Sequence, residues 1–132
     1  MEFAYISLER ITMKKRIIII EDDETIKKTF SLILKDYDIE VFSSGEEAIR
    51  EINKLSDGTI QLVITDYKLP GINGIKFIEA LKKRGYKGKI ILISAYPNLI
   101  GVEDLVKTGI DCFFVKPLEL DKLIESIKNL LS

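Results

Sequence analysis

The sequence contains no histidine, no tryptophan and a single cysteine, and it has no long hydrophobic run. Without histidine, the common zinc-binding sets and every Ser–His or Cys–His catalytic pair are excluded. The lone Cys112 cannot form an intrachain disulfide, and its apolar neighbours predict a small buried side chain. These absences exclude several common classes of hydrolase and metal site before any motif is considered.

Membrane and nucleic-acid signals are also lacking. The dense apolar run at residues 17–20 is far shorter than the ~20 residues that span a membrane. Residues 1–12 lack the basic, apolar and small-residue order of a secretory signal. A net charge of −1, from 20 basic and 21 acidic residues, disfavours broad nucleic-acid binding. We therefore expect a cytoplasmic protein with no direct contact to membrane or nucleic acid.

The chain is long enough, at 132 residues, for one domain with a proper core. From Lys14 onward, β-branched runs alternate with amphipathic stretches, which predicts an α/β domain with a parallel sheet. The expected strands contain residues 17–20, 41–42, 62–65, 90–93 and 112–115. The expected helices carry the apolar stripes Ile26, Phe30, Ile33 and Tyr37; Ala48, Ile49, Ile52 and Leu55; Ile75, Ile78 and Leu81; Leu99, Val102, Leu105 and Val106; and Leu120, Leu123, Ile124, Ile127 and Leu131.

Residues 1–12 lie outside this alternation. Met13 would be an ordinary start directly before the first strand, and residues 13–132 suffice for all five strands and five helices. We predict an N-terminal extension over residues 1–12, either an accessory segment or a start-site choice, and one domain over residues 13–132. An arm that packs on a partner through Phe3, Tyr5 and Leu8 is the alternative.

Polar residues follow four of the five expected strands, at the edge where ligands bind in open parallel sheets. They are Glu21, Asp22 and Asp23 after the first strand, Asp66 after the third, Ser94 after the fourth and Lys116 after the fifth.

A strand order of 2-1-3-4-5 would bring Glu21, Asp22 and Asp66 together. Two carboxylates about 5 Å apart repel by roughly 3 kcal/mol at an effective dielectric constant near 20, so such a cluster favours a cation. All-oxygen ligation suits Mg²⁺. Lys116 and Ser94 add an ammonium and a hydroxyl suited to phosphoryl oxygens. The sequence therefore predicts a site for phosphoryl transfer.

At this point the chain is seen to resemble a known family. Residues 14–132 resemble the receiver domain of two-component response regulators, a flavodoxin-like, doubly wound fold with strand order 2-1-3-4-5. Residues 17–24 resemble its strand and acidic segment, and residues 66–74 the stretch that begins with the phosphoacceptor aspartate. Residues 93–95 resemble its hydroxyl-plus-small pair, and residues 113–117 its strand with the switch aromatic and the lysine. All occur in the family's order and spacing.

The resemblance implies a role for each acidic residue. Asp66 would be the nucleophile that takes a phosphoryl group from a partner's phosphohistidine. Asp22, Asp66 and the backbone carbonyl of Lys68 would hold Mg²⁺, with Glu21 acting through water. Asp23 is then expected to be a helix cap rather than a ligand.

It also implies how the signal is made. Lys116 and Ser94 would contact the phosphoryl oxygens, Ser94 and Phe113 would form the switch, and the bond between Lys116 and Pro117 would be cis. Glu21, Ser94 and Phe113 stand where Asp, Thr and Tyr are commoner in the family. Partly buried packing is the alternative reading of Phe113.

Partners follow from the same resemblance. A sensor histidine kinase or histidine phosphotransfer protein would supply the phosphoryl group. With no module expected after the last helix, a stand-alone receiver, monomer or weak dimer, would contact a downstream protein through its fourth helix, fifth strand and fifth helix, or relay the phosphoryl group onward. Within this region, Leu99 and Ile100 are either core or an exposed partner patch. Such a protein modifies itself and is not expected to be a turnover enzyme.

Three other functions compete with this one. A flavodoxin-like cofactor binder needs a Ser/Thr/Gly-rich phosphate loop where this chain has acidic residues. An aspartate-nucleophile phosphohydrolase would need an acid at position 68, which is lysine. A degenerate receiver that binds partners without phosphorylation is the main alternative. We also hypothesise that Lys68 and Tyr96 set how fast water attacks the phosphoaspartate.

Overall fold

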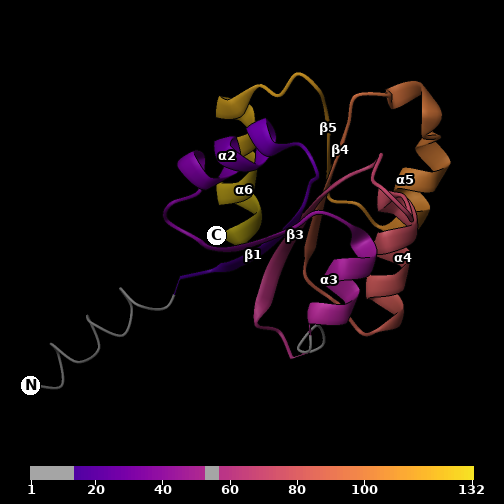
Figure 1. The fold of residues 1–132 in the computed structure, drawn as a ribbon, viewed down its shortest axis with the longest axis horizontal. Coiled ribbons are helices and arrows are strands. Elements are labelled where there is room, and N and C mark those ends of the chain that lie inside the picture. Colours follow the sequence, from indigo (N-terminus) through magenta and orange to yellow (C-terminus); the bar gives the residue numbers. More distant parts are fainter. Residues whose placement is uncertain (1–13, 53–56) are drawn as a thin grey trace, which may run out of the picture.

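Strands and helices alternate along the chain in a computed structural model that describes residues 14–52 and 57–132 (Figure 1). The strands are β1 (Arg16–Ile20), β2 (Asp38–Phe42), β3 (Ile60–Asp66), β4 (Lys89–Ser94) and β5 (Cys112–Val115). The helices are α2 (Glu24–Ile33), α3 (Gly45–Glu51), α4 (Gly74–Lys83), α5 (Val102–Thr108) and α6 (Leu120–Leu131), with a 3₁₀ turn η1 (Pro97–Leu99) before α5. The predicted extension over residues 1–12, and Leu55, lie outside the described residues.

The five strands form one sheet in the order β2-β1-β3-β4-β5, and every neighbouring pair is parallel. This confirms the predicted α/β fold and strand order. Helices α2 and α6 cover one face of the sheet, and α3, α4 and α5 cover the other (Figure 1). Ile17 and Ile19 pack toward the first layer, Ile18 and Ile20 toward the second, and all four are fully buried. An uninterrupted isoleucine run is therefore the sequence of a strand covered on both faces.

Polar side chains cap the starts of three helices. The side chains of Asp23, Ser44 and Asn73 accept hydrogen bonds from the backbone N–H three residues later, at 2.9, 3.1 and 2.9 Å. Each cap satisfies an N–H group that has no partner within its helix, and is worth about 1 kcal/mol. Asp23 is thus a cap, as predicted, and it fixes where the chain turns away from the end of β1.

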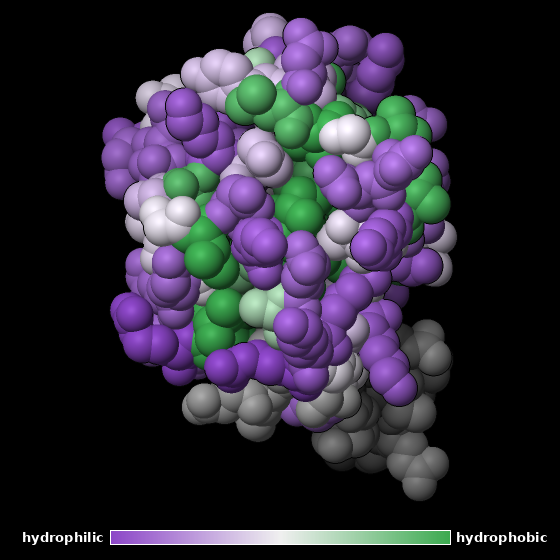
Figure 2. Space-filling view, turned by 90° about the vertical axis from the view of Figure 1, so that its right-hand side faces the viewer, coloured by the Kyte–Doolittle hydropathy of each residue, from purple (hydrophilic) through white to green (hydrophobic). Residues whose placement is uncertain are grey.

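The stripe predicted for the fourth helix is wrong. Gly101 is not inside a helix but forms the N-cap of α5, so the helix begins afresh at Val102. Val102 and Val106 are each 75% exposed and Leu99 is 62% exposed, while Leu105 packs on the core. Ile100 is buried in the core, whereas its neighbour Leu99 is exposed, so only Leu99 is available to a partner. Hydrophobic residues therefore appear among hydrophilic ones on the side of the molecule that carries α5 (Figure 2).

Smaller departures occur at two other positions. Tyr37 lies beyond the end of α2, although it still packs against the cluster between α2, α6 and the sheet. Cys112 is half-buried rather than buried, because β5 is an edge strand of only four residues. Among the described residues, no helix has the length and apolar character needed to span a membrane.

Candidate functional site

The carboxyl ends of the strands bring the predicted site residues to one edge of the sheet. Asp66 is the last residue of β3 and Ser94 the last of β4, while Glu21 and Lys116 directly follow β1 and β5. One carboxylate oxygen from each of Glu21, Asp22 and Asp66 lies within 4.8 Å of the others. The predicted convergence of three acids is therefore present in the structure.

Lys116 bridges two of these acids. Its Nζ donates to Asp66 Oδ2 at 2.6 Å and to Glu21 Oε2 at 3.3 Å. Its backbone N–H donates to the Ser94 carbonyl at 2.9 Å, and its bond to Pro117 is cis, as predicted. Burial disfavours the charged ammonium, but the hydrogen bond to Asp66 and the negative charges outweigh burial and raise the pKa of Lys116. The lysine is therefore held in its charged form at the centre of the cluster.

Glu21 is the most deeply buried of the three acids, with 1% of its surface exposed. Its Oε1 accepts the Asp23 N–H at 3.0 Å. Burial raises the pKa of Glu21 to about 6 and the charge of Asp66 adds to the rise, although the Asp23 N–H and Lys116 act in the opposite direction. The cost of burying a charged Glu21 therefore outweighs the stabilisation that the Asp23 N–H and Lys116 give to the charged form.

This donor set fits Mg²⁺. Asp22 is exposed, Asp66 is buried beside it, and both offer carboxylate oxygens, the ligands that Mg²⁺ prefers. The carbonyl of Lys68, two residues after Asp66, accepts no backbone hydrogen bond within the described residues. Glu21 already uses both oxygens, on Asp23 and on Lys116, which suits an indirect role through water. The predicted ligand set is thus compatible with the structure.

The two predicted switch residues lie in different environments. Ser94 is fully buried, and its Oγ accepts the Tyr96 N–H at 2.8 Å, so the hydroxyl proton can be donated elsewhere. Phe113 is half-buried and packs on the cluster beneath α3, α4 and α5. The proximity of Ser94 to the end of the sheet agrees with its predicted position, and the switching of both residues stays a prediction.

Three contacts at the site could not be read from the motifs. The ammonium of Lys68 lies 4.9 Å from the centre of the Tyr96 ring, a cation–π contact between the loop that follows β3 and the segment that follows β4. Gly74 is required because a Cβ there would lie 2.4 Å from the Asp66 carbonyl oxygen. Glu46, on α3, reaches the loop after Asp66, and nothing in its local sequence marks this role.

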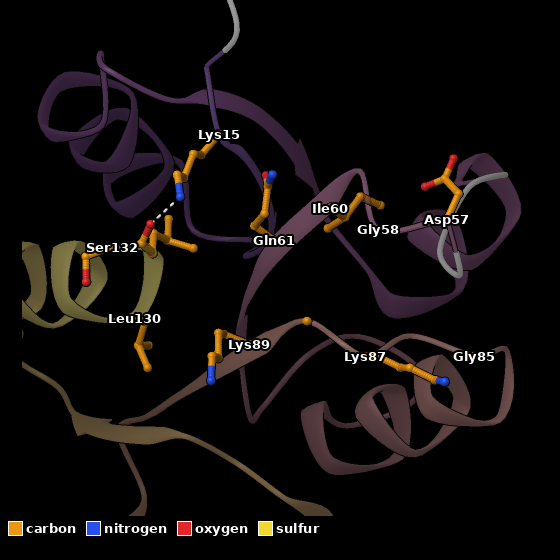
Figure 3. A pocket seen from close by; sticks show the side chains of 12 residues that line it. Lys15, Asp57, Gly58, Ile60, Gln61, Gly85, Lys87, Lys89, Leu130 and Ser132 are labelled. Atoms are coloured by element: carbon orange, nitrogen blue, oxygen red, sulfur yellow. Dashed lines mark hydrogen bonds between the residues drawn. The ribbon is translucent and has the colours of Figure 1, made fainter. Parts of the chain in front are cut away.

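A pocket of about 480 Å³ lies at the opposite edge of the sheet, beside the amino ends of β1, β3 and β4 (Figure 3). Its rim carries Lys15, Lys87 and Lys89, all exposed, and their side chains are spread around the opening. Lys15 donates to the Leu131 carbonyl at the end of α6. None of the predicted site residues lines this pocket, so the pocket and the charged cluster are separate features.

Comparison with known proteins agrees with this geometry. Residues 17–128 match the family model described as "Response regulator receiver domain". The chain is 28% identical over 120 residues to the chemotaxis protein CheY of Bacillus subtilis, covering 91% of this chain and 100% of CheY. It is 32% identical over 117 residues to the cell cycle response regulator CtrA of Brucella ovis, covering 85% of this chain and 48% of CtrA.

Solved structures give the same result. The response regulator TrrA of Thermotoga maritima, in complex with Mg²⁺ and BeF, is 33% identical, with a TM-score of 0.72 over 88% of this chain and 98% of TrrA. A CheY-like receiver domain from Methanospirillum hungatei is 26% identical, with a TM-score of 0.74 over 88% of this chain and 92% of that one. The strand order, the sheet topology and the geometry of the site agree with the match in sequence. The chain belongs to the response regulator receiver domain family of two-component systems.

Proposed function

We propose that this chain is a phosphoacceptor whose Asp66 takes a phosphoryl group from the phosphohistidine of a sensor histidine kinase or a histidine phosphotransfer protein. Receiver domains of this family interact with histidine kinases and downstream partners, and typically bind Mg²⁺ at an acidic pocket. The observation that carries the proposal is the Asp66 carboxylate, buried at the carboxyl edge, bonded to Lys116 and flanked by two further acids.

In the reaction, an Asp66 oxygen would form a bond to phosphorus while the bond from phosphorus to the partner's imidazole nitrogen breaks. The imidazole leaves and takes up a proton, and Asp66 becomes an acyl phosphate. When bound, Mg²⁺ would neutralise charge on the phosphoryl oxygens. Lys116, whose ammonium already lies 2.6 Å from Asp66 Oδ2, would add a second positive charge at the same place. Because the phosphoryl group stays on the chain until water removes it, the protein would act as a switch rather than as a turnover enzyme.

Ser94 would pass the modification to the rest of the fold. Its hydroxyl, free to donate, would bond a phosphoryl oxygen and draw in the chain that follows β4. That chain leads through η1 to α5, where Leu99, Val102 and Val106 are exposed, and Val115 of the neighbouring β5 is 46% exposed. We propose the surface of α5, β5 and α6 as the contact for a downstream protein, with Phe113 responding beneath it.

A degenerate receiver that binds partners without being phosphorylated is the alternative function. The experiment that separates the two is incubation with a small acyl phosphate and Mg²⁺, followed by measurement of the intact mass. We expect a phosphoryl adduct on the wild type and on Asp121→Ala, an exposed acid of α6, and none on Asp66→Asn or in the presence of a chelator. A folded wild type that forms no adduct would favour the degenerate receiver.

A further inference from the structure

The loop between Asp66 and α4 is closed at both ends by backbone hydrogen bonds. The Tyr67 N–H donates to the Ile93 carbonyl at 2.7 Å, and the Gly74 N–H donates to the Tyr67 carbonyl at 2.7 Å. These bonds fix where the loop starts and ends. They leave the middle of the loop, which includes Lys68, to be ordered by other contacts.

Glu46 supplies the contact in the middle of the loop. From the first turn of α3, its Oε2 accepts the Ile72 N–H at 3.0 Å. Gly71 has a positive φ of 77°, and a Cβ there would lie 2.2 Å from Glu46 Oε2, so the carboxylate packs directly against the glycine Cα. Only glycine combines this backbone conformation with so close an approach.

Holding the carboxylate of Glu46 in this position costs free energy of folding. Its other oxygen, Oε1, is buried and has no hydrogen-bond partner within the described residues. A buried polar atom without a partner costs free energy, whereas the hydrogen bond to Ile72 returns only part of it. The clear structural gain is an ordered loop, which points to a role at the site that the loop serves.

The backbone between Ile72, which Glu46 contacts, and Lys68, whose carbonyl is the expected metal ligand, is conformationally restricted. Leu69 is buried in the core, Pro70 has a fixed φ, and Gly71 is held in its left-handed conformation. A hydrogen bond at Ile72 therefore restricts the backbone as far back as Lys68. If it were lost, Gly71 would regain the conformational freedom of glycine and the loop would loosen.

We propose that Glu46 is a positioning residue for Mg²⁺: by holding the Ile72 N–H it preorganises the loop that carries the Lys68 carbonyl. The inference rests on the proposed function of the site. Glu46 does not touch the metal or the phosphoryl group; it acts through the backbone of the loop. Removing a group that orients a metal ligand typically lowers metal affinity about tenfold or more.

The test is a calorimetric titration of folded variants with Mg²⁺ alone. If Glu46 acted through its negative charge, the effects of Glu46→Gln and Glu46→Asp on Mg²⁺ affinity would be the reverse of those expected if it acts through its hydrogen bond to Ile72. Glu46→Gln removes the charge but keeps an oxygen that can accept from Ile72, so we expect affinity close to wild type. Glu46→Asp keeps the charge but is too short to reach Ile72, so we expect about tenfold weaker binding, as for Glu46→Ala. Glu47→Ala, in the same helical turn, is the matched control and should bind like the wild type.

The rate of amide hydrogen exchange at Ile72, measured without Mg²⁺, is a second readout. A change in global stability alone would not alter exchange at Ile72 selectively. We expect exchange at Ile72 to be faster in Glu46→Asp and unchanged in Glu47→Ala. Wild-type Mg²⁺ affinity in a folded Glu46→Asp variant would overturn the inference while leaving the proposed function intact. A wild type that binds no Mg²⁺ at all would overturn both.

Discussion

The charged side chains at the two edges of the sheet differ in burial and in spacing. At the carboxyl edge, Glu21 and Asp66 are 1% and 6% exposed and share one lysine. At the amino edge, Lys87 and Lys89 are exposed on the rim of a pocket of about 480 Å³ (Figure 3). The amino edge offers this hollow, but its charges are solvated and spread apart. Convergent, buried charge identifies the site better than pocket volume does.

The difference follows from what burial costs. Like charges placed together away from water repel and lose hydration, so a fold tolerates them only with compensation. Lysines on an open rim stay hydrated, so they lose little free energy in this way. One of them, Lys15, also stabilises the last turn of α6 by donating to the Leu131 carbonyl. Substitutions of the buried charges at the carboxyl edge should therefore change both stability and metal binding, whereas substitutions of the exposed Lys87 and Lys89 at the amino edge should change neither.

The largest effect is expected from Lys116→Ala, which leaves Glu21 and Asp66 without their shared cation. Without metal, the free energy of unfolding should fall by about 3 kcal/mol, because two carboxylates stay buried and unpaired. Mg²⁺ should bind more tightly, since the ammonium no longer repels it. Urea unfolding and calorimetry measure the two quantities, with Lys89→Ala as the control at the amino edge. Equal Mg²⁺ affinity in the two variants would contradict the expectation.

The next effect concerns pH and Glu21. Its pKa of about 6 in the folded state exceeds the ordinary value of 4.5, so between these values the native state binds more protons than the unfolded state. The stability that protonated Glu21 provides is complete below pH 4.5 and is lost as the pH rises through 6. Glu21→Gln cannot ionise, so relative to wild type it should gain about 2 kcal/mol across this window.

Denaturant unfolding at a series of pH values, with a chelator present, measures the gain. If the stability difference between Glu21→Gln and wild type is constant from pH 4.5 to pH 7, the acidic edge is less desolvated than its burial indicates. The contrast between the two edges would then be weakened.

A smaller effect is expected from Lys68 and Tyr96, which follow the strand ends that carry Asp66 and Ser94. Replacing both with alanine removes a contact worth about 0.5–1 kcal/mol. The rate at which water removes the phosphoryl group should change by about two- to fivefold. Half-lives of the phosphorylated wild type, both single variants and the double variant provide the measurement. An unchanged half-life in the double variant would reject the hypothesis.

The smallest effect is expected at the amino edge. Replacing Lys87 and Lys89 with alanine should alter the free energy of unfolding by less than about 0.5 kcal/mol, because both side chains are exposed. The rate of phosphorylation by a small acyl phosphate should also be unchanged. A clear loss of phosphorylation would show that the two edges are coupled, and would break the comparison.

Much of the fold and the site was predictable from the sequence. Unbroken isoleucine runs predict strands buried on both faces, and the polar residues that end or follow four of the five strands mark the edge where ligands bind. Asp66, Lys116 and Ser94 were found this way because each is fixed by a strand end, and parallel pairing then sets them side by side.

Other features depended on contacts that no local pattern records. Periodicity placed Val102 and Val106 in the core, but Gly101 restarts the helix and turns that face outward. Glu46 lies 26 residues from Ile72, and only the packing of α3 beside the loop brings them together. The division at residue 13 and the role of residues 1–12 stay predictions.

The central claim is that convergent, buried charge at the carboxyl edge makes Asp66 the acceptor. The most direct measurement is to phosphorylate the wild type with a small acyl phosphate and Mg²⁺, reduce the acyl phosphate with borohydride, and map the converted residue by peptide mass spectrometry. The account predicts conversion of Asp66 to homoserine and of no other acid. Conversion at Asp57, on the rim of the amino-edge pocket, or at Asp22 with Asp66 intact, would contradict it.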